Sequence, residues 1–219
     1  MSTLSINRLT ILFFIYILSL AVKNYNCKKW RKTMNNSITK TKNVFATQNL
    51  VLMALFAAVL CVSAYISIPL PNGSHITALN FVVTLIGLVF TIEQSFLISL
   101  VWLLLGAVGV PVFIGGQGGI GYLFGQYGGY SFAFVIIAIL LPVFCKREYN
   151  RISFTIAAII SAIFVDVFGS IWIMIIGGIN LKAAFIAGFL PFIALDTVKA
   201  IVAAQIAPAF RRILNNAIN

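Results

Sequence analysis

A series of apolar runs, beginning at Asn49 and continuing almost to the C-terminus, constrains the fold of this sequence more than any other feature. Short stretches rich in proline, glycine or charge separate the runs, for example at Pro69 and Glu93. An α-helix needs about 20 predominantly apolar residues to cross a bilayer. We therefore expect six membrane-spanning helices, over residues 49–67, 76–91, 95–110, 130–145, 152–176 and 183–209.

The composition also indicates a membrane protein. The chain is 61% hydrophobic and 9% charged, whereas a soluble domain is about half apolar and about a quarter charged. The runs are too long for the strands of a membrane barrel, which alternate over about ten residues. The predicted fold class is an all-α membrane protein, a bundle of six transmembrane helices.

The distribution of Lys and Arg predicts the orientation of the bundle. With the N-terminus inside, twelve basic residues fall in cytoplasmic regions and one, Lys182, falls outside. Lys and Arg are enriched in cytoplasmic loops. Both termini are therefore predicted to be cytoplasmic, and a glycine-rich stretch at 115–129 is predicted to face outward.

Several classes of function lack their sequence signatures. The net charge of +11 does not indicate a nucleic-acid partner, because the basic residues flank apolar segments and form no stripe on a soluble face. The cysteines, Cys27, Cys61 and Cys145, form no CxxC pair, and one histidine, His75, cannot make a metal site alone. We expect His75 to be a loop or entrance residue. No ATPase, hydrolase or zinc-protease motif is present, so we expect no enzymatic activity, cofactor or metal.

The last apolar run carries an acid and a base, Asp196 and Lys199, three residues apart. A charged side chain at the middle of a bilayer costs about 2.5–3.5 kcal/mol on insertion scales, and positions i and i+3 share one face of a helix. The two side chains are therefore predicted to share a polar pocket. Two interpretations are open: a functional site, and a structural ion pair that locks two helices together.

Other polar and small residues are candidates for contacts inside the bundle. Asn80, early in the second run, can donate and accept hydrogen bonds in a site or between helices. Asp166 can pair with Lys199, with the backbone or with a ligand. The first run carries small residues on one face, including Ala54 and Ala58. Such a face permits close docking, either within the bundle or to a partner subunit.

The glycine-rich stretch contains a formal GxGxxG, but a dinucleotide site requires that motif between a strand and a helix of a soluble unit. Glycines permit positive φ and close approach of other backbone. Tyr122, Tyr127 and Tyr130 supply flat surfaces with hydroxyl groups. We expect a re-entrant loop or lid over an outward-facing pocket.

Four segments are predicted along the chain. Residues 1–33 form an N-terminal extension, which reflects either a misassigned start, because Met34 opens the next segment, or an extra anchor. Residues 34–48 form a basic cytoplasmic segment, and residues 49–210 form the six-helix substrate-binding domain. Residues 211–219 form a cytoplasmic tail.

Three motifs resemble those of the BioY family, the biotin-specific substrate-capture components of energy-coupling-factor (ECF) transporters. They are Gly109-Val-Pro-Val-Phe-Ile-Gly-Gly-Gln-Gly-Gly-Ile-Gly121, Gly125-Gln-Tyr-Gly-Gly-Tyr130 and Ala194-Leu-Asp-Thr-Val-Lys-Ala200. The sequence departs from the family at Gln126-Tyr127, where Pro-Thr is usual, and at Ala194-Leu195, where Pro-Gly is usual. Asn80 stands where many relatives carry Gln.

This resemblance implies high-affinity biotin binding and uptake across the plasma membrane, with a transmembrane scaffold subunit and two ATPase subunits as partners. It implies that Asp196 and Lys199 belong to the biotin site, and that Ala54 and Ala58 dock on the scaffold subunit. The full predicted set of substrate-binding residues is Asn80, Gly116, Gln117, Tyr122, Tyr130, Trp172, Asp196 and Lys199.

Two alternative functions remain open from the residues alone. The first is an ion-coupled secondary transporter for another vitamin, in which Asp196 relays a proton. The second is an intramembrane enzyme that uses Asp196 and Lys199 as acid and base, although the sequence offers no nucleophile or metal site beside them.

Overall fold

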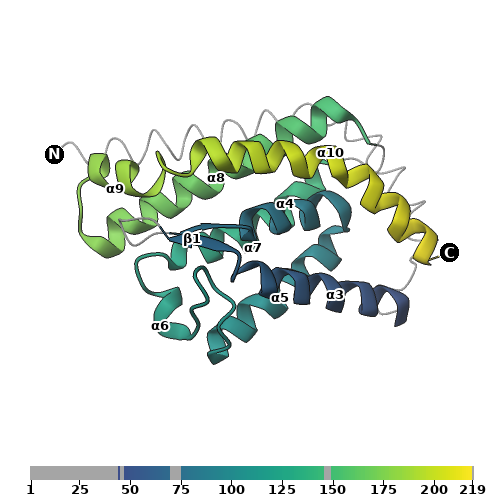
Figure 1. Cartoon of the computed structure of the whole chain (residues 1–219), viewed down its shortest axis with the longest axis horizontal. Helices are drawn as coiled ribbons and strands as arrows, with labels where there is room; N and C mark the ends of the chain where they lie inside the picture. Colours follow the sequence, from purple (N-terminus) through teal and green to yellow (C-terminus); the bar gives the residue numbers. More distant parts are fainter. Residues whose placement is uncertain (1–43, 45–46, 70–74, 146–148, 219) are drawn as a thin grey trace, which may run out of the picture. The chain divides into compact units, whose positions relative to one another are not determined.

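The computed structural model describes residue 44 and residues 47–69, 75–145 and 149–218. The predicted extension 1–33 and most of the predicted basic segment 34–48 lie outside these described residues. The elements, in chain order, are α3 (Thr47–Ser63), β1 (Ser67–Pro69), β2 (His75–Thr77), α4 (Leu79–Val89), α5 (Ile92–Val108), α6 (Ile120–Leu123), α7 (Gly128–Phe144), α8 (Arg151–Gly177), α9 (Leu181–Gly188) and α10 (Ile193–Ile218) (Figure 1).

Five of the six predicted runs form one helix each, namely α3, α4, α5, α7 and α8. Side-chain caps explain where two of them begin. Thr91 accepts a hydrogen bond from the backbone N–H of Gln94, whose side chain accepts one from Thr91 in return, and this capping box starts α5. Asn150 accepts from the first backbone N–H groups of α8. Both caps satisfy donors that the first turn of a helix leaves unpaired.

The sixth predicted run forms two helices, α9 and α10, so the prediction of one continuous helix over 183–209 was wrong. Pro191 lies between them. Proline has no N–H and its ring clashes with the carbonyl four residues earlier, so it interrupts a helix. At its other end α10 continues to Ile218, past the predicted end at residue 209 and through most of the predicted tail.

Two short strands depart from the all-α expectation. β1 and β2 pair in antiparallel fashion, with Ser67 opposite Thr77 and Pro69 opposite His75. This hairpin follows the end of α3 at Ser63, which lies before the predicted end of the first run at residue 67. The hairpin brings His75 and Thr77 directly before the first turn of α4 and so helps to form the site.

Small residues set the close packing of α10, which lies along α8 and α4 (Figure 1). Four alanines of α10 are buried in this packing, at Ala200, Ala203, Ala204 and Ala207. Gly87 of α4 has a similar role against α7, because a Cβ there would come within 2.8 Å of the Cβ of Leu141. Small residues let helix backbones approach closely.

The glycine-rich stretch folds back onto α5. The backbone N–H of Gly119 donates to the carbonyl of Gly106 over 2.6 Å, and the indole N–H of Trp102 donates to the carbonyl of Val112 over 2.8 Å. Gly115 and Gly116 both adopt the left-handed region, with φ of +73° and +71°, which glycine tolerates best. The stretch is thus held by specific contacts, while its position relative to a membrane stays a prediction.

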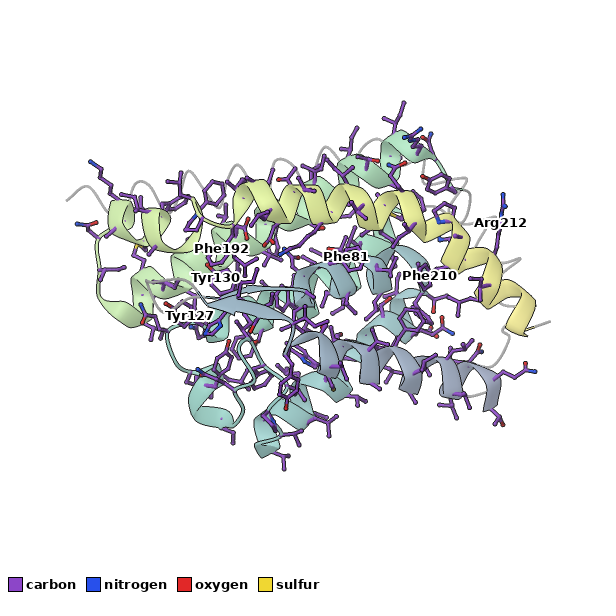
Figure 2. All side chains as sticks on the ribbon, viewed as in Figure 1. Phe81, Tyr127, Tyr130, Phe192, Phe210 and Arg212 are labelled. Atoms are coloured by element: carbon purple, nitrogen blue, oxygen red, sulfur yellow. The ribbon has the colours of Figure 1, made fainter. Side chains whose placement is uncertain are left out.

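Many side chains project outward from the helices (Figure 2), and many of the large apolar ones are exposed. They include Val51 and Leu55 of α3 and Ile152 of α8. A large exposed apolar surface marks an interaction with a membrane or a partner. Two helices, α8 and residues Ile193–Leu214 of α10, are long and apolar enough to cross a membrane, and α3, α4, α5 and α7 are shorter apolar helices. The count of six spans therefore stays a prediction.

Candidate binding site

Two predicted site residues, Asn80 of α4 and Asp196 of α10, meet in a buried hydrogen bond. The Asn80 Nδ2 donates to Asp196 Oδ2 over 2.8 Å. The Lys199 Nζ donates to the other carboxylate oxygen, Oδ1, over 2.8 Å and to the carbonyl of Thr77 over 2.9 Å. We call these four residues, Thr77, Asn80, Asp196 and Lys199, the polar cluster. It joins β2, α4 and α10.

Local structure places the carboxylate where a negative charge is favoured. Asp196 lies in the first turn of α10, and its backbone N–H donates to the carbonyl of Phe192. The N-terminal end of a helix carries a partial positive charge. Lys199 follows on the same face, one turn later. Asp196 is therefore stabilised by its helix, by an ammonium group and by an amide.

Asn80 keeps unused hydrogen-bonding capacity. Its Oδ1 is buried and has no hydrogen-bond partner within the described part of the chain. A buried polar atom without a partner costs about 1–3 kcal/mol. Such an atom at the wall of a cavity is a natural place for a ligand donor.

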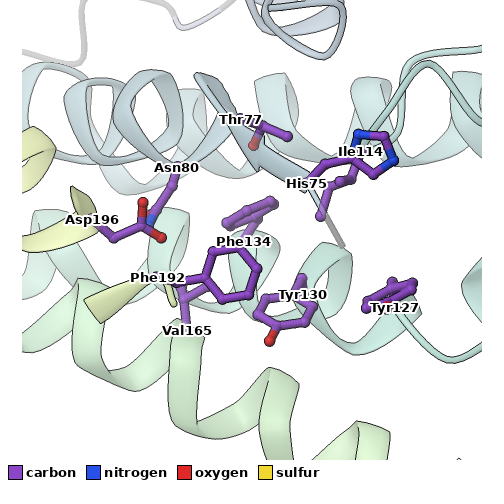
Figure 3. Close-up of a pocket in the computed structure, with 10 residues that line it drawn as sticks. All are labelled: His75, Thr77, Asn80, Ile114, Tyr127, Tyr130, Phe134, Val165, Phe192 and Asp196. Carbon is purple, nitrogen blue, oxygen red and sulfur yellow. The ribbon is translucent and has the colours of Figure 1, made fainter. Parts of the chain in front are cut away.

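Three residues of the polar cluster, Thr77, Asn80 and Asp196, line a small cavity with a largely apolar wall (Figure 3). Its occupiable volume is about 30 Å³, which is room for a water molecule. The lining residues are His75, Thr77, Asn80, Ile114, Tyr127, Tyr130, Phe134, Val165, Phe192 and Asp196. Pockets for ligands of drug size hold roughly 300–1,000 Å³. The walls must therefore separate before an organic ligand enters.

Tyr130 of α7 joins the cavity wall to the break between α9 and α10. Its hydroxyl donates to the carbonyl of Gly188 over 2.6 Å, and its ring meets Phe192 edge to face at 6.1 Å between centroids (Figure 2). Its ring also covers Gly169 of α8, where a Cβ would overlap the ring. The break at Pro191 thus has a structural consequence, because it leaves a helix-end carbonyl for Tyr130 to bind.

The predicted site residues divide into two groups in the structure. Asn80, Asp196 and Lys199 come together, and of the first group Asn80, Asp196 and Tyr130 line the cavity whereas Lys199 does not. The other four, Gly116, Gln117, Tyr122 and Trp172, are not among the residues that line this cavity. A role for those four in ligand binding stays a prediction.

The second group holds the glycine-rich stretch together. Tyr122 stacks on Phe113, with ring centroids 5.0 Å apart. The carbonyl of Gln117 accepts a hydrogen bond from the backbone N–H of Phe113. The indole N–H of Trp172 donates to the carbonyl of Gly125 over 2.9 Å. These contacts fix the backbone that borders the cavity.

Asp166 of α8 is buried behind the cavity wall, next in sequence to the lining residue Val165. Neither of its carboxylate oxygens has a hydrogen-bond partner among the described residues. Of the predicted partners, Lys199 instead bonds Asp196 and Thr77. Asp196 is nevertheless close enough to Asp166 for an electrostatic interaction.

Sequence reasoning did not assign several lining residues to the site. Ile114, Phe134, Val165 and Phe192 belong to apolar segments, where nothing in the sequence separates a cavity wall from a core position. His75 was expected at a loop or entrance, and β2 places it in the cavity wall. The sequence signal that could have assigned His75 to the site is its position just before Thr77 and Asn80.

Ala54 and Ala58, the predicted docking residues, lie on the exposed part of α3. Large exposed apolar residues flank them, including Val51, Leu55 and Val62. A partner helix can therefore reach both alanines, and docking there stays a prediction.

Metal binding receives no support from the described residues, which contain no group of three or more His, Cys, Asp or Glu side chains able to hold an ion.

Comparison with known proteins gives a consistent family assignment. A sequence model of the BioY family matches residues 34–216. The biotin transporter BioY2 of Lactococcus lactis is 31% identical over 169 residues, which cover 77% of this chain and 92% of that protein. A probable biotin transporter BioY of Pyrococcus horikoshii is 36% identical over 159 residues, covering 71% of this chain and 91% of that one.

Solved structures show the same fold. The crystal structure of the S-component for biotin from an ECF-type ABC transporter superposes with a TM-score of 0.70 at 27% identity, covering 79% of this chain and 95% of that chain. FolT bound with folic acid superposes with a TM-score of 0.53 at 15% identity, covering 75% of this chain and 98% of that one, which is a likeness of fold alone. The relatives are transporters, so this is a membrane protein. From these matches, and from the motif residues Asp196 and Lys199 that meet in the polar cluster, the chain belongs to the BioY family.

Proposed function

We propose that this protein captures biotin at the polar cluster and mediates its uptake as the substrate-specific component of an ECF-type transporter. The observation that carries the proposal is that Asn80 and Asp196 meet in the wall of one apolar-walled cavity, with Lys199 bonded to Asp196. Few polar groups in an apolar wall are typical of small-molecule sites. The membership of the BioY family and the shared fold support biotin as the ligand.

The polar cluster matches the head of biotin chemically. The ureido ring of biotin offers two N–H donors and one carbonyl acceptor, and its fused thiophane ring is apolar. The Asp196 carboxylate accepts from N–H groups, and Asn80 or Lys199 can donate to the carbonyl. The ligand would compete for the hydrogen bond between Asn80 and Asp196 and would also use the free Asn80 Oδ1.

Binding requires the cavity to open, because its present volume admits little more than water. Two segments border it without being continuous helix, the β1–β2 hairpin and the glycine-rich stretch. They touch where His75 packs against Gly115, since a Cβ at Gly115 would lie 3.1 Å from the imidazole. Opening at this contact admits the ligand while α4 and α10 keep Asn80, Asp196 and Lys199 in place.

The sequence and the exposed surface support a proposed arrangement in the membrane. Six spans, with both termini cytoplasmic and the cavity open to the outside of the plasma membrane, place twelve basic residues inside and one outside. The apolar side chains exposed on α3, α5 and α8 would then face lipid or partner subunits. Accessibility of single cysteines at residues 182 and 217 to an impermeant reagent tests this topology, and labelling of residue 217 from outside would contradict it.

Energy for uptake would come from partner subunits. The sequence has no ATPase motif, which fits a capture component that works with a transmembrane scaffold and two ATPases. The exposed pair Ala54 and Ala58 on α3 offers a small-residue surface for a scaffold helix. No cofactor or enzymatic step enters this proposal.

Titration calorimetry of the ligand-free protein in detergent tests the function directly. The titrants are biotin and a panel of other vitamins, including folate, riboflavin and thiamine. Nanomolar binding of biotin without a response to the others is the expected result. Folded, ligand-free protein that binds none of them, or binds another vitamin more tightly, would overturn the assignment of biotin.

A further inference from the structure

The cavity has a second polar end, away from Asp196. Figure 3 shows Asn80 and Asp196 on one side of the cavity and His75 and Tyr127 on the other. Between them the wall is formed by apolar and aromatic side chains, among them Phe134 and Phe192. A ligand lying along this cavity would therefore need polar groups at both ends and an apolar middle.

His75 has hydrogen-bonding capacity that the protein does not use. Its Nδ1 is buried and has no hydrogen-bond partner among the described residues. Backbone pairing with Pro69 fixes the residue in β2, and the imidazole packs against Gly115. Any side chain at Gly115 would press on the ring and would also be strained by its φ of +73°. The imidazole is thus held at the cavity wall between the hairpin and the glycine-rich stretch.

Charge decides which end of biotin lies where. The carboxylate tail of biotin is anionic, and placing it beside the Asp196 carboxylate would be repulsive. Lys199 offsets only part of this repulsion, because two of its three N–H donors are already used by Asp196 and by the carbonyl of Thr77. The neutral ureido ring suits that end, so the tail extends toward the other end of the cavity. An imidazole there can donate a hydrogen bond to a carboxylate.

We propose that His75 binds the carboxylate of the ligand's tail and thereby selects free biotin over biotin whose tail is blocked as an amide. This inference rests on the proposed function and adds to it a specificity for the free acid. It also gives Gly115 a role, because only a residue without a side chain lets the glycine-rich stretch lie against the imidazole.

The test compares biotin with biotinamide by titration calorimetry on the full chain, in which His75→Phe removes both ring nitrogens. The unsubstituted protein should bind biotin more tightly than biotinamide. A hydrogen bond to a charged group contributes enough that His75→Phe should weaken biotin binding about 10- to 100-fold. Affinity for biotinamide should change by less than about threefold, so the preference for the free acid disappears.

Two further variants keep the test decisive. His75→Gln retains a neutral donor and should give an intermediate preference, and it replaces His75→Phe if that variant does not fold. Ile68→Ala alters an exposed residue of the same hairpin and should leave both affinities unchanged. Equal weakening of both ligands, or an unchanged preference in the two His75 variants, would show that His75 does not bind the tail. Failure of the unsubstituted protein to bind biotin would instead overturn the proposed function itself.

Discussion

The Asn80 Nδ2 donates to the Asp196 Oδ2 over 2.8 Å, although the two residues are 116 positions apart in the chain. This hydrogen bond joins α4 to α10 inside an apolar bundle, where a lone carboxylate would be costly. Together with Lys199 it gives each oxygen of the carboxylate one hydrogen-bond donor. A ligand that displaces Asn80 from Asp196 must therefore replace the hydrogen bond that this carboxylate loses.

Asp196→Asn should weaken biotin binding. The variant keeps the shape of the side chain but replaces a charged acceptor with a neutral amide, and a hydrogen bond to a charged group contributes about 1.5–3 kcal/mol. The expected loss in affinity is about 10- to 100-fold by titration calorimetry. Val198→Ala, at a position of the same helix that is 57% exposed, is the control and should bind normally. An Asp196→Asn protein with unchanged affinity would remove the carboxylate from the site.

Lys199→Met should lower both stability and biotin affinity. It removes the hydrogen bonds to Asp196 and to the carbonyl of Thr77, and it leaves a mostly buried carboxylate without its counter-charge. The expected loss of stability is about 1–3 kcal/mol, measured by thermal unfolding in detergent. Adding Asp196→Asn should restore part of it, because the double variant has no unpaired charge. If the double variant loses as much stability as the sum of the losses in the two single variants, the pair is not coupled.

Gly169→Ala should destabilise the protein and weaken ligand binding together. A Cβ at residue 169 would overlap the Tyr130 ring, which lines the cavity. Because overpacking a well-packed core costs about 1–3 kcal/mol, the melting temperature should fall. Gly121→Ala is a matched control, since a Cβ there would meet nothing within 4 Å. If both variants melt and bind alike, the packing of Tyr130 on α8 does not shape the cavity.

Ala58→Leu should block assembly with a scaffold subunit while leaving biotin binding intact. Residue 58 lies on the exposed side of α3, where a larger side chain would keep a partner helix away. Recovery of scaffold and ATPase subunits with the affinity-tagged chain measures assembly, and calorimetry measures binding. Val59→Leu, at the next exposed position, should assemble normally. Normal assembly of the Ala58→Leu protein would place the docking surface elsewhere.

The local features of the fold were readable from the sequence. The apolar runs predicted α3, α4, α5, α7 and α8, because helix formation in these segments depends on residues that are near neighbours in the chain. The pairing of Asp196 and Lys199 was predictable for the same reason, since a helix brings positions i and i+3 to one face. The break at Pro191 had a visible signal, but the length of the apolar run concealed it.

Long-range relationships were decided only by tertiary structure. Three hydrogen bonds join residues that lie on different elements. They pair Asn80 with Asp196, Lys199 with the carbonyl of Thr77, and the Tyr130 hydroxyl with the carbonyl of Gly188. Which faces of the helices meet depends on the fit of many small and large side chains at once. The sequence by itself thus determined α3, α4, α5, α7 and α8, the candidate charges and the family resemblance. The tertiary structure decided that Asn80 and Asp196 lie at one end of the cavity and His75 at the other, because distant segments acquire neighbours only when they pack.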